Sequence, residues 1–332
     1  MAIRTETLEK SSAFDELEER LIRAKRCEPG FRYGLYIRHA AAIAVLFAIS
    51  VGLVLIGDLF LVHMASAVVL AIAFAQGGFL MHSIAHLGIP RHWRNVAYAG
   101  IDFAFFWSTD AWKEKHDAHH ARPNSSEDPD FTDIRFISLT PEQARKKKGL
   151  YRLMTQYQHW LVLCLLFFQA GQLRCTNISY LLRQRTARAG CTLLLMGLHV
   201  ALYFYALFSF LPLWHAMAFI LVHNGLLGFY LGVAFAPNHI GMPPANEGND
   251  YVFVQASTAG NISGEWWVTM LLGGLNFQIE HHLFPCLPDL YEISLIVRPF
   301  CKERGIPYRS ESFWQAWQRV ILHLREMAMH AA

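Results

Sequence analysis

Four long stretches of the sequence contain no Asp, Glu, Lys or Arg, and they restrict the possible folds more than any other feature. They are residues 40–57, 59–81, 190–211 and 213–237. A helix needs about 20 apolar residues to cross the roughly 30 Å hydrocarbon core of a bilayer. The chain is 54% hydrophobic and 17% charged, whereas soluble proteins average about 25% charged residues. The sequence therefore predicts an all-α integral membrane protein with four transmembrane helices.

The connections within each pair of stretches are short and lack basic residues. Gly57 and Asp58 separate the first pair and Pro212 separates the second, so we expect two helical hairpins. Basic residues lie instead at the N-terminus, in residues 145–188 and toward the C-terminus. Because cytosolic loops carry the excess of Lys and Arg, we expect both termini in the cytosol. A cytosolic helical cap would comprise residues 82–189 and 238–332, and we expect a multi-pass protein of a bacterial inner membrane.

Residues 1–38 form a charged N-terminal segment that precedes the membrane domain, residues 39–332. From Ser11 to Arg26, apolar residues recur at helical spacing, which predicts an amphipathic helix on the membrane surface or on the cap. We expect no signal peptide, because no apolar core with a small-residue cleavage site occurs there. The six cysteines contain no Cys-x-x-Cys pair and are expected to be reduced. A net charge of +3 without a basic stripe argues against a nucleic-acid partner.

Seven of the histidines form three clusters beside the predicted membrane boundaries. The clusters are His82 and His86; His116, His119 and His120; and His281 and His282. The second cluster has the spacing i, i+3 and i+4, which places three imidazoles on one face of a helix. An isolated histidine at a bilayer edge is more often an interfacial side chain. A zinc site needs only three or four ligands, so seven clustered imidazoles on one side of the membrane indicate more than one metal ion.

The three clusters resemble the histidine boxes of the integral-membrane fatty acid desaturases. The third box reads Gln278-Ile-Glu-His-His-Leu-Phe-Pro285 and follows Gly273-Gly-Leu-Asn276, and the second is surrounded by Trp112, Pro123-Asn124 and Asp128-Pro-Asp130. From about Met81 to the C-terminus, this pattern is most similar to the front-end acyl desaturases. The resemblance implies four membrane helices and a cytosolic cap that holds two iron ions. It also implies His239 as a further metal ligand and a Gln, here Gln278, at one position of the third box.

The resemblance implies a reaction and its partners as well. The expected protein is a membrane-bound desaturase that uses O2 and two external electrons at a histidine-ligated diiron site to introduce a cis double bond. Its substrate would be a long acyl chain carried as an acyl lipid, acyl-CoA or acyl-carrier protein. The sequence contains no His-Pro-Gly-Gly haem motif of the kind found in fused b-type cytochrome domains. We therefore expect electrons from a separate ferredoxin or b-type cytochrome with its reductase.

Several residues of the boxes have more than one possible role. Gln278 can coordinate weakly, hold a water or support a ligand through a hydrogen bond, and we favour the roles other than coordination. Asp117 and Glu280 either orient ligand imidazoles or are solvated residues of the cap. A narrow substrate tunnel is expected between the cap and the membrane helices. Its predicted lining consists of Trp107, Trp112, Trp267 and Phe277.

Two other functions stay open at this stage. A diiron hydroxylase or ketolase that acts on a lipid or carotenoid would share the scaffold. A non-enzymatic metal-binding or transport protein would place its site near the middle of the membrane, unlike the boxed histidines. Within or near the second hairpin, His199, His215 and His223 are expected to form hydrogen bonds to neighbouring helices. The basic runs at 145–148 and 183–188 are interpreted as topology signals, with docking of an acidic electron donor as the alternative.

Overall fold

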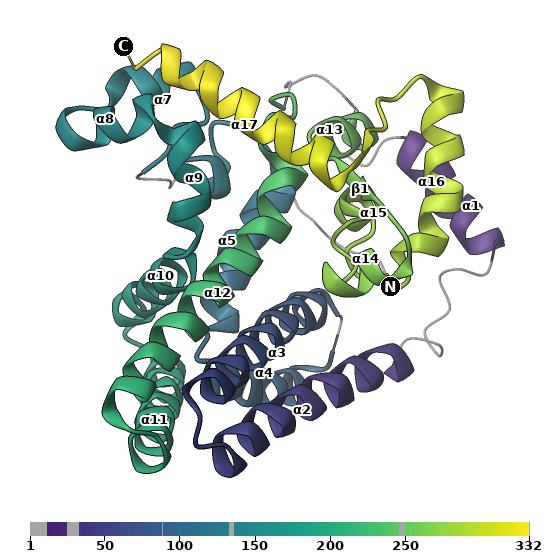
Figure 1. Cartoon of the computed structure of the whole chain (residues 1–332). Coiled ribbons are helices and arrows are strands. Elements are labelled where there is room, and N and C mark those ends of the chain that lie inside the picture. The colour runs from purple at the N-terminus through teal and green to yellow at the C-terminus, as the bar shows by residue number, and fades with distance from the viewer. Residues whose placement is uncertain (1–11, 25–32, 88, 133–135, 246–249, 332) are drawn as a thin grey trace. The chain divides into compact units, whose positions relative to one another are not determined.

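A computed structural model describes residues 12–24, 33–87, 89–132, 136–245 and 250–331, which are mostly helical (Figure 1). The chain forms two compact units. The histidine unit takes its residues from 1–31, 115–162 and 234–332, and the long-helix unit consists of residues 32–114 and 163–233. Each unit is described by itself.

The helices and strands follow one another along the chain with short connections. The helices are α1 (Ser12–Arg23), α2 (Tyr33–Ile56), α3 (Phe60–His86), α4 (Arg91–Phe105), α5 (Thr109–Ala121), α6 (Pro129–Thr132), α7 (Pro141–Lys146), α8 (Gly149–Gln156), α9 (Gln158–Leu166), α10 (Gln169–Gln184), α11 (Ala187–Phe210), α12 (Leu213–His239), α13 (Tyr251–Ser257), α14 (Trp266–Leu271), α15 (Gln278–Leu283), α16 (Leu290–Arg304) and α17 (Phe313–Met329). Within the described ranges there are two strands, β1 (Asn261–Ser263) and β2 (Ser310–Ser312). They pair in parallel, with Asn261 opposite Ser310.

Among the described residues, four helices are long and apolar enough to cross a membrane, namely α2, α3, α11 and α12. They have 24, 27, 24 and 27 residues, which corresponds to about 36–40 Å at 1.5 Å per residue. Each overlaps one of the apolar stretches found in the sequence, so the prediction of four such helices is confirmed. Both α3 and α12 continue past the predicted bounds and end at a histidine, His86 and His239.

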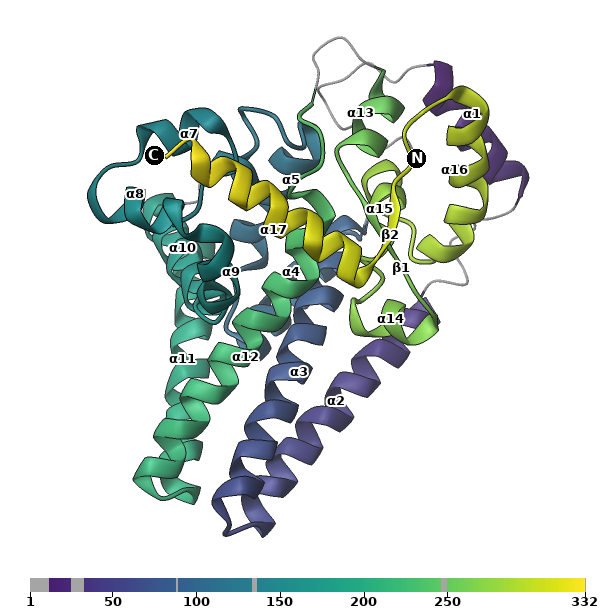
Figure 2. The ribbon, with the colours of Figure 1, turned by 45° about the horizontal axis from the view of Figure 1, so that its top comes forward.

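Polar side chains join the helices of the long-helix unit to one another. α2 packs along α3 (Figure 2), where Ser66 Oγ donates to the Ser50 carbonyl at 2.8 Å. Hydrogen bonds between helices help association where the surroundings are as apolar as the helices themselves. The three histidines of α11 and α12 also bond to neighbouring helices or their ends, as predicted. Their partners are the Phe103 carbonyl for His199, His63 for His215, and Tyr203 for His223, with distances of 2.8, 2.8 and 2.9 Å.

The helices α9 and α10 form a pair that is bent by 73°. The sequence predicts a short apolar segment from Tyr157 to Ala170, followed by a basic segment on the cytosolic side. In the structure, the bent pair is apolar enough to be a broken span or a re-entrant loop. Gly228 of α12 permits close packing here, because an added Cβ would lie 2.7 Å from the Leu166 carbonyl oxygen. The basic segment is thus built into the long-helix unit, where α10 packs on α11.

The histidine unit has an apolar core between its short helices. The core includes Val252 of α13, Ile279 of α15 and Val297 of α16, each with 0–1% of its surface exposed. Burial of an aliphatic side chain of this size contributes about 1.5–3 kcal/mol. Each of the three helices has fewer than 16 residues, and isolated helices of that length are marginal in water. Tertiary packing therefore holds α15, which carries the third histidine box.

The N-terminal helix α1 buries its apolar face within the histidine unit. Phe14, Leu17 and Leu21 are 4%, 0% and 0% exposed, and α1 packs on α13 and α16. The predicted amphipathic helix is therefore confirmed over Ser12–Arg23, and its apolar face is covered by protein; Ser11 and residues 25–26 lie outside the described residues. The C-terminal tail is helical as predicted, and a capping box of Ser312 and Gln315 begins α17.

Candidate metal centre

Six of the predicted metal ligands lie in the histidine unit. They are His116, His119 and His120 of α5, His281 and His282 of α15, and His239 at the end of α12. All except His239 are at most 8% exposed. Burying several imidazole rings costs folding free energy unless their nitrogens form hydrogen bonds or bind a metal ion. The positions of these nitrogens therefore indicate which of the rings could bind a metal ion together.

Three imidazoles form the first group. His120 Nε2 lies 2.9 Å from His116 Nε2 and 3.0 Å from His281 Nε2. Two nitrogens that each bind one ion at about 2.1 Å, with an angle of 90–110° between them, are about 3.0–3.4 Å apart. The three Nε2 atoms are therefore spaced like ligands that share one metal ion.

A second group of three has the same spacing. His239 Nε2 lies 3.1 Å from His282 Nε2 and 3.3 Å from His119 Nε2. Gln278 Nε2 lies 3.1 Å from His239 Nε2. Neighbouring histidines of α5 thus enter different groups, His119 in the second and His120 in the first. A single helix with the spacing i, i+3 and i+4 can therefore serve two metal positions.

Hydrogen bonds on the outer side of the second group fix the tautomer of each ring. His119 Nδ1 is 2.8 Å from Asp128 Oδ2, His239 Nδ1 is 3.0 Å from the Thr258 carbonyl, and His282 Nδ1 is 2.8 Å from Gln255 Oε1. Each oxygen accepts a hydrogen bond, so each neutral ring carries its proton on Nδ1 and an exposed lone pair on Nε2. Three lone pairs that face one another are mutually repulsive. A metal cation at their centre removes this repulsion, so these residues fit a metal ion.

Asp128 supports His119 most directly. Its carboxylate is fully buried and also accepts from the backbone N–H groups of Asn124 and Asp130, each at 2.8 Å. Burial lowers the pKa of His119, but the hydrogen bond that His119 donates to Asp128 and the charges of Asp130 and Asp128 outweigh it, so the pKa is raised. Carboxylate partners of this kind orient a ligand imidazole and raise its basicity.

The three other box residues have different surroundings. Gln278 Oε1 accepts from Asn238 Nδ2 at 3.1 Å, and its amide nitrogen faces His239 Nε2. That nitrogen has one lone pair, so a hydrogen bond from Gln278 and a metal ion are alternative partners for it. Glu280 binds Asn261 and Tyr308 at 2.8 and 2.7 Å, so it braces α15 from behind. Burial raises the pKa of Glu280 to about 7 in spite of those hydrogen bonds. Asp117 is exposed on α5.

The first histidine box lies in the long-helix unit. His82 and His86 occupy the last two turns of α3, with their ring centres 5.1 Å apart. Trp112 packs edge-on against His82 at 5.1 Å. The first turn of α5 is held by Asp102, whose Oδ1 accepts from Thr109 N at 2.7 Å and from Thr109 Oγ1 at 2.6 Å. Burial raises the pKa of Asp102 to about 7, against these hydrogen bonds.

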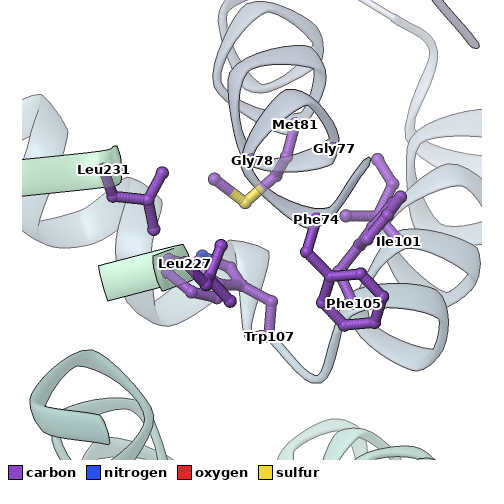
Figure 3. A pocket seen from close by; sticks show the side chains of 9 residues that line it. All are labelled: Phe74, Gly77, Gly78, Met81, Ile101, Phe105, Trp107, Leu227 and Leu231. Carbon is purple, nitrogen blue, oxygen red and sulfur yellow. The ribbon is translucent and has the colours of Figure 1, made fainter. Parts of the chain in front are cut away.

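The predicted tunnel residues have four different environments. Trp107 is 7% exposed and lines an apolar pocket of the long-helix unit with Phe74 and Phe105 (Figure 3). Trp112 covers the first histidine box. Phe277 is partly buried against the core of the histidine unit. Trp267 is 50% exposed on α14.

Two residues of the site were not identified from the sequence. Gln255 holds His282, and its amide nitrogen also donates to the His120 carbonyl at 2.9 Å. A single polar residue in the apolar run Val252-Phe-Val-Gln255 is the sequence signal that could have found it. The Thr258 carbonyl, which holds His239, has no such signal because any residue supplies a carbonyl.

Comparison with known proteins agrees with this geometry. The model of the family described as "Fatty acid desaturase" matches residues 58–312. The chain belongs to the fatty acid desaturase family, whose members are oxidoreductases that act on fatty acyl chains. The resemblance to front-end desaturases is confirmed by the names of the relatives.

Three of these relatives illustrate the similarity. An acyl-lipid (9-3)-desaturase of Physcomitrium patens is 30% identical over 90% of this chain and 59% of its own length. The same-named enzyme of Borago officinalis is 32% identical over 87% of this chain and 69% of its own length. The Delta(6)-fatty-acid desaturase fat-3 of Caenorhabditis elegans is 30% identical over 81% of this chain and 65% of its own length. The chain thus spans about 60–70% of the length of these relatives. All three relatives are eukaryotic, so they do not support the expectation that this protein lies in a bacterial inner membrane.

Proposed function

We propose that this chain is a membrane-bound, front-end acyl desaturase with a histidine-ligated diiron centre. The proposal rests on the two groups of three histidines in the histidine unit, whose Nε2 atoms face one another. In the second group, hydrogen bonds to Asp128, Gln255 and the Thr258 carbonyl fix the tautomer of each ring. Two groups with ligand spacing fit two metal ions. The names of the relatives, which are acyl-lipid and fatty-acid desaturases, support the acyl substrate.

The proposed ligands are the eight histidines that the resemblance to the desaturases implies. One iron would be held by His116, His120 and His281, and the other by His119, His239 and His282. His82 and His86 would complete the set. Imidazole nitrogen is a donor that suits iron. Gln278 would lie beside the second group without coordinating.

When bound, the irons would supply the oxidising chemistry for removing two hydrogens from adjacent methylene groups. The balanced reaction joins the acyl chain, O2, two electrons and two protons, and it yields the cis alkene and two waters. The residues of this chain would position one methylene pair and keep bulk water out of the centre, since precise placement of reactants contributes much of an enzyme's rate. His119 and its partner Asp128 would hold the second iron in a fixed geometry.

The electron donor and the membrane orientation are also part of this proposal. Electrons would come from a separate ferredoxin or b-type cytochrome with its reductase. Both termini and the metal centre would face the cytosol, since the basic segments of the chain avoid the short turns between the apolar helices. The acyl chain would be presented as an acyl lipid, acyl-CoA or acyl-carrier protein.

Fatty-acid profiling tests the proposed reaction. A host that expresses the chain is fed several unsaturated fatty acids, and the products are analysed by mass spectrometry with location of the double bonds. A new polyunsaturated acid, desaturated between an existing double bond and the carboxyl end, is expected for the wild type. The His120→Ala variant should lose it completely, whereas His92→Ala, which changes an exposed histidine of α4, should keep it.

Other products would contradict the proposal in distinct ways. A product heavier by one oxygen would show a hydroxylase on the same scaffold. An unchanged profile in a host that supplies a competent electron donor, with iron-loaded protein present in its membranes, would exclude fatty acyl desaturation.

A further inference from the structure

The long-helix unit contains a second group of basic side chains, separate from the histidine boxes. We call it the arginine cluster: Arg174 of α10, His199 and Tyr203 of α11, and His223 and Asn224 of α12. Arg174 donates a hydrogen bond to Asn224 Oδ1, and its guanidinium lies 4.9 Å from the centre of the Phe106 ring. Three elements of the unit therefore converge on one guanidinium.

The charge of this cluster has no acidic partner. Among the described residues, Arg174 forms no ion pair with a carboxylate, whereas Arg188 of the same unit pairs with Asp110. Asn224 stands 11 residues into α12, about 16 Å from the start of that apolar helix. An uncompensated cation at such a depth is costly and marks a functional site by default.

Two hydrogen-bond donors of the cluster are buried without an acceptor. They are Arg174 Nε and His223 Nε2. His223 is 1% exposed, and its Nδ1 lies 2.9 Å from the Tyr203 hydroxyl. When that hydroxyl donates, the neutral ring carries its proton on Nε2. A buried donor without a partner costs about 1–3 kcal/mol. Two such donors beside an unpaired guanidinium are complementary to an oxyanion.

An apolar pocket lies next to the cluster. Phe106 has a left-handed backbone (φ 53°), which is a strained conformation for a bulky residue, and it contacts His199 and Arg174. Its neighbours Phe105 and Trp107 line the pocket of Figure 3, which has about 270 Å³ of empty space. Phe74 also lines it and packs edge-on against His223 at 4.8 Å. The 270 Å³ includes open solvent, and the cavity itself has a volume of about 10 Å³, about enough for one water molecule. An apolar tail would therefore lie along these side chains and not inside the pocket.

We propose that the arginine cluster binds the oxyanion head group of a membrane amphiphile, either a carboxylate or a phosphodiester. Arg174 and His223 would donate to the oxyanion, and the adjoining part of the apolar tail would lie against Phe74 and Trp107. Arg174 is only partly buried, which leaves a route from the surrounding lipid. The site is independent of the metal ligands, so amphiphile binding would persist in iron-free protein.

Native mass spectrometry of the full chain in a neutral detergent tests this site. Oleate is compared with oleyl alcohol, and dioleoylphosphatidylglycerol with dioleoylglycerol, so that each oxyanion has a neutral twin. The wild type is expected to bind one oxyanion with at least a tenfold preference over its twin. The pair that shows the preference identifies the source of the oxyanion. Arg183→Gln, which changes an exposed arginine of the same helix, should keep that preference.

The variants Arg174→Gln and His223→Phe are expected to bring the preference close to one. Arg174→Lys should keep part of it because the positive charge is retained. Two independent positions guard against the failure of one variant to fold, which a thermal melt would reveal. Equal binding of the oxyanions and their neutral twins to the wild type would overturn the proposal. A preference that survives both Arg174→Gln and His223→Phe would overturn it as well, because the oxyanion would then be bound elsewhere.

Discussion

At the scale of single residues, the site depends on the atoms behind the metal ligands. The Nδ1 atoms of His119, His239 and His282 each face an oxygen, and this directs their Nε2 lone pairs toward a common centre. The motif spacing was sufficient to identify the histidines themselves. It could not identify the oxygens, because two of the three come from segments more than 15 residues away in the chain and one is a backbone carbonyl.

Replacement of Asp128 by Asn tests this support. The amide cannot stabilise the His119 imidazole through its charge, so iron binding and desaturation should each fall about 10–100-fold. Metal content and product formation are measured on the same purified protein. Asp117→Asn is the matched control, since Asp117 is an exposed carboxylate of the same helix, and it should change both by less than about twofold. Equal losses for the two variants would show that Asp128 has no special role.

At the scale of elements, the long apolar helices were predictable and the connections between them were not. Hydrophobic runs near 20 residues leave few alternatives to a membrane helix, and α2, α3, α11 and α12 appear where the sequence indicated. At the bend between α9 and α10 the backbone packs closely against Gly228 of α12, and periodicity along one segment does not encode such a contact. The left-handed residue Phe106, which ends α4 just before α5, is likewise held by tertiary contacts.

The start of α5 offers a prediction about pH. The folded protein holds Asp102 at a pKa of about 7, above the value of about 3.9 in an unfolded chain. The folded state therefore binds more protons between these values, and its stability falls as the pH rises from about 4 to 7. In Asp102→Asn the Oδ1 acceptor for Thr109 is kept and no charge forms. This variant should be more stable than the wild type at pH 8, on the order of 2–4 kcal/mol.

Thermal melts in detergent from pH 5 to 8.5 measure this effect. The advantage of Asp102→Asn should be smallest at pH 5 and reach a plateau above about pH 7.5. Asp117→Asn, with an exposed carboxylate, should show no such growth. An advantage of Asp102→Asn that shrinks as the pH rises would mean that the carboxylate is stabilised, instead of penalised, by its surroundings.

At the scale of the whole molecule, the eight proposed ligands come from four separate segments of the chain. The first box belongs to the long-helix unit, and the other six histidines belong to the histidine unit. Ligands supplied by segments far apart in the chain make metal binding and folding interdependent. The sequence could predict which histidines participate because the boxes have distinctive spacing. It could not predict the arginine cluster, whose members come from three helices and share no motif.

The central claim is that the two histidine groups hold two iron ions. The most direct measurement is the metal content of the purified full chain, by elemental analysis together with Mössbauer spectroscopy of protein enriched in iron-57. We expect two irons per chain with the magnetic coupling of neighbouring ions, and a loss of iron from both His119→Ala and His120→Ala. His92→Ala should keep both ions. A single iron, or zinc in its place, in wild-type protein that forms the desaturated product would contradict the account.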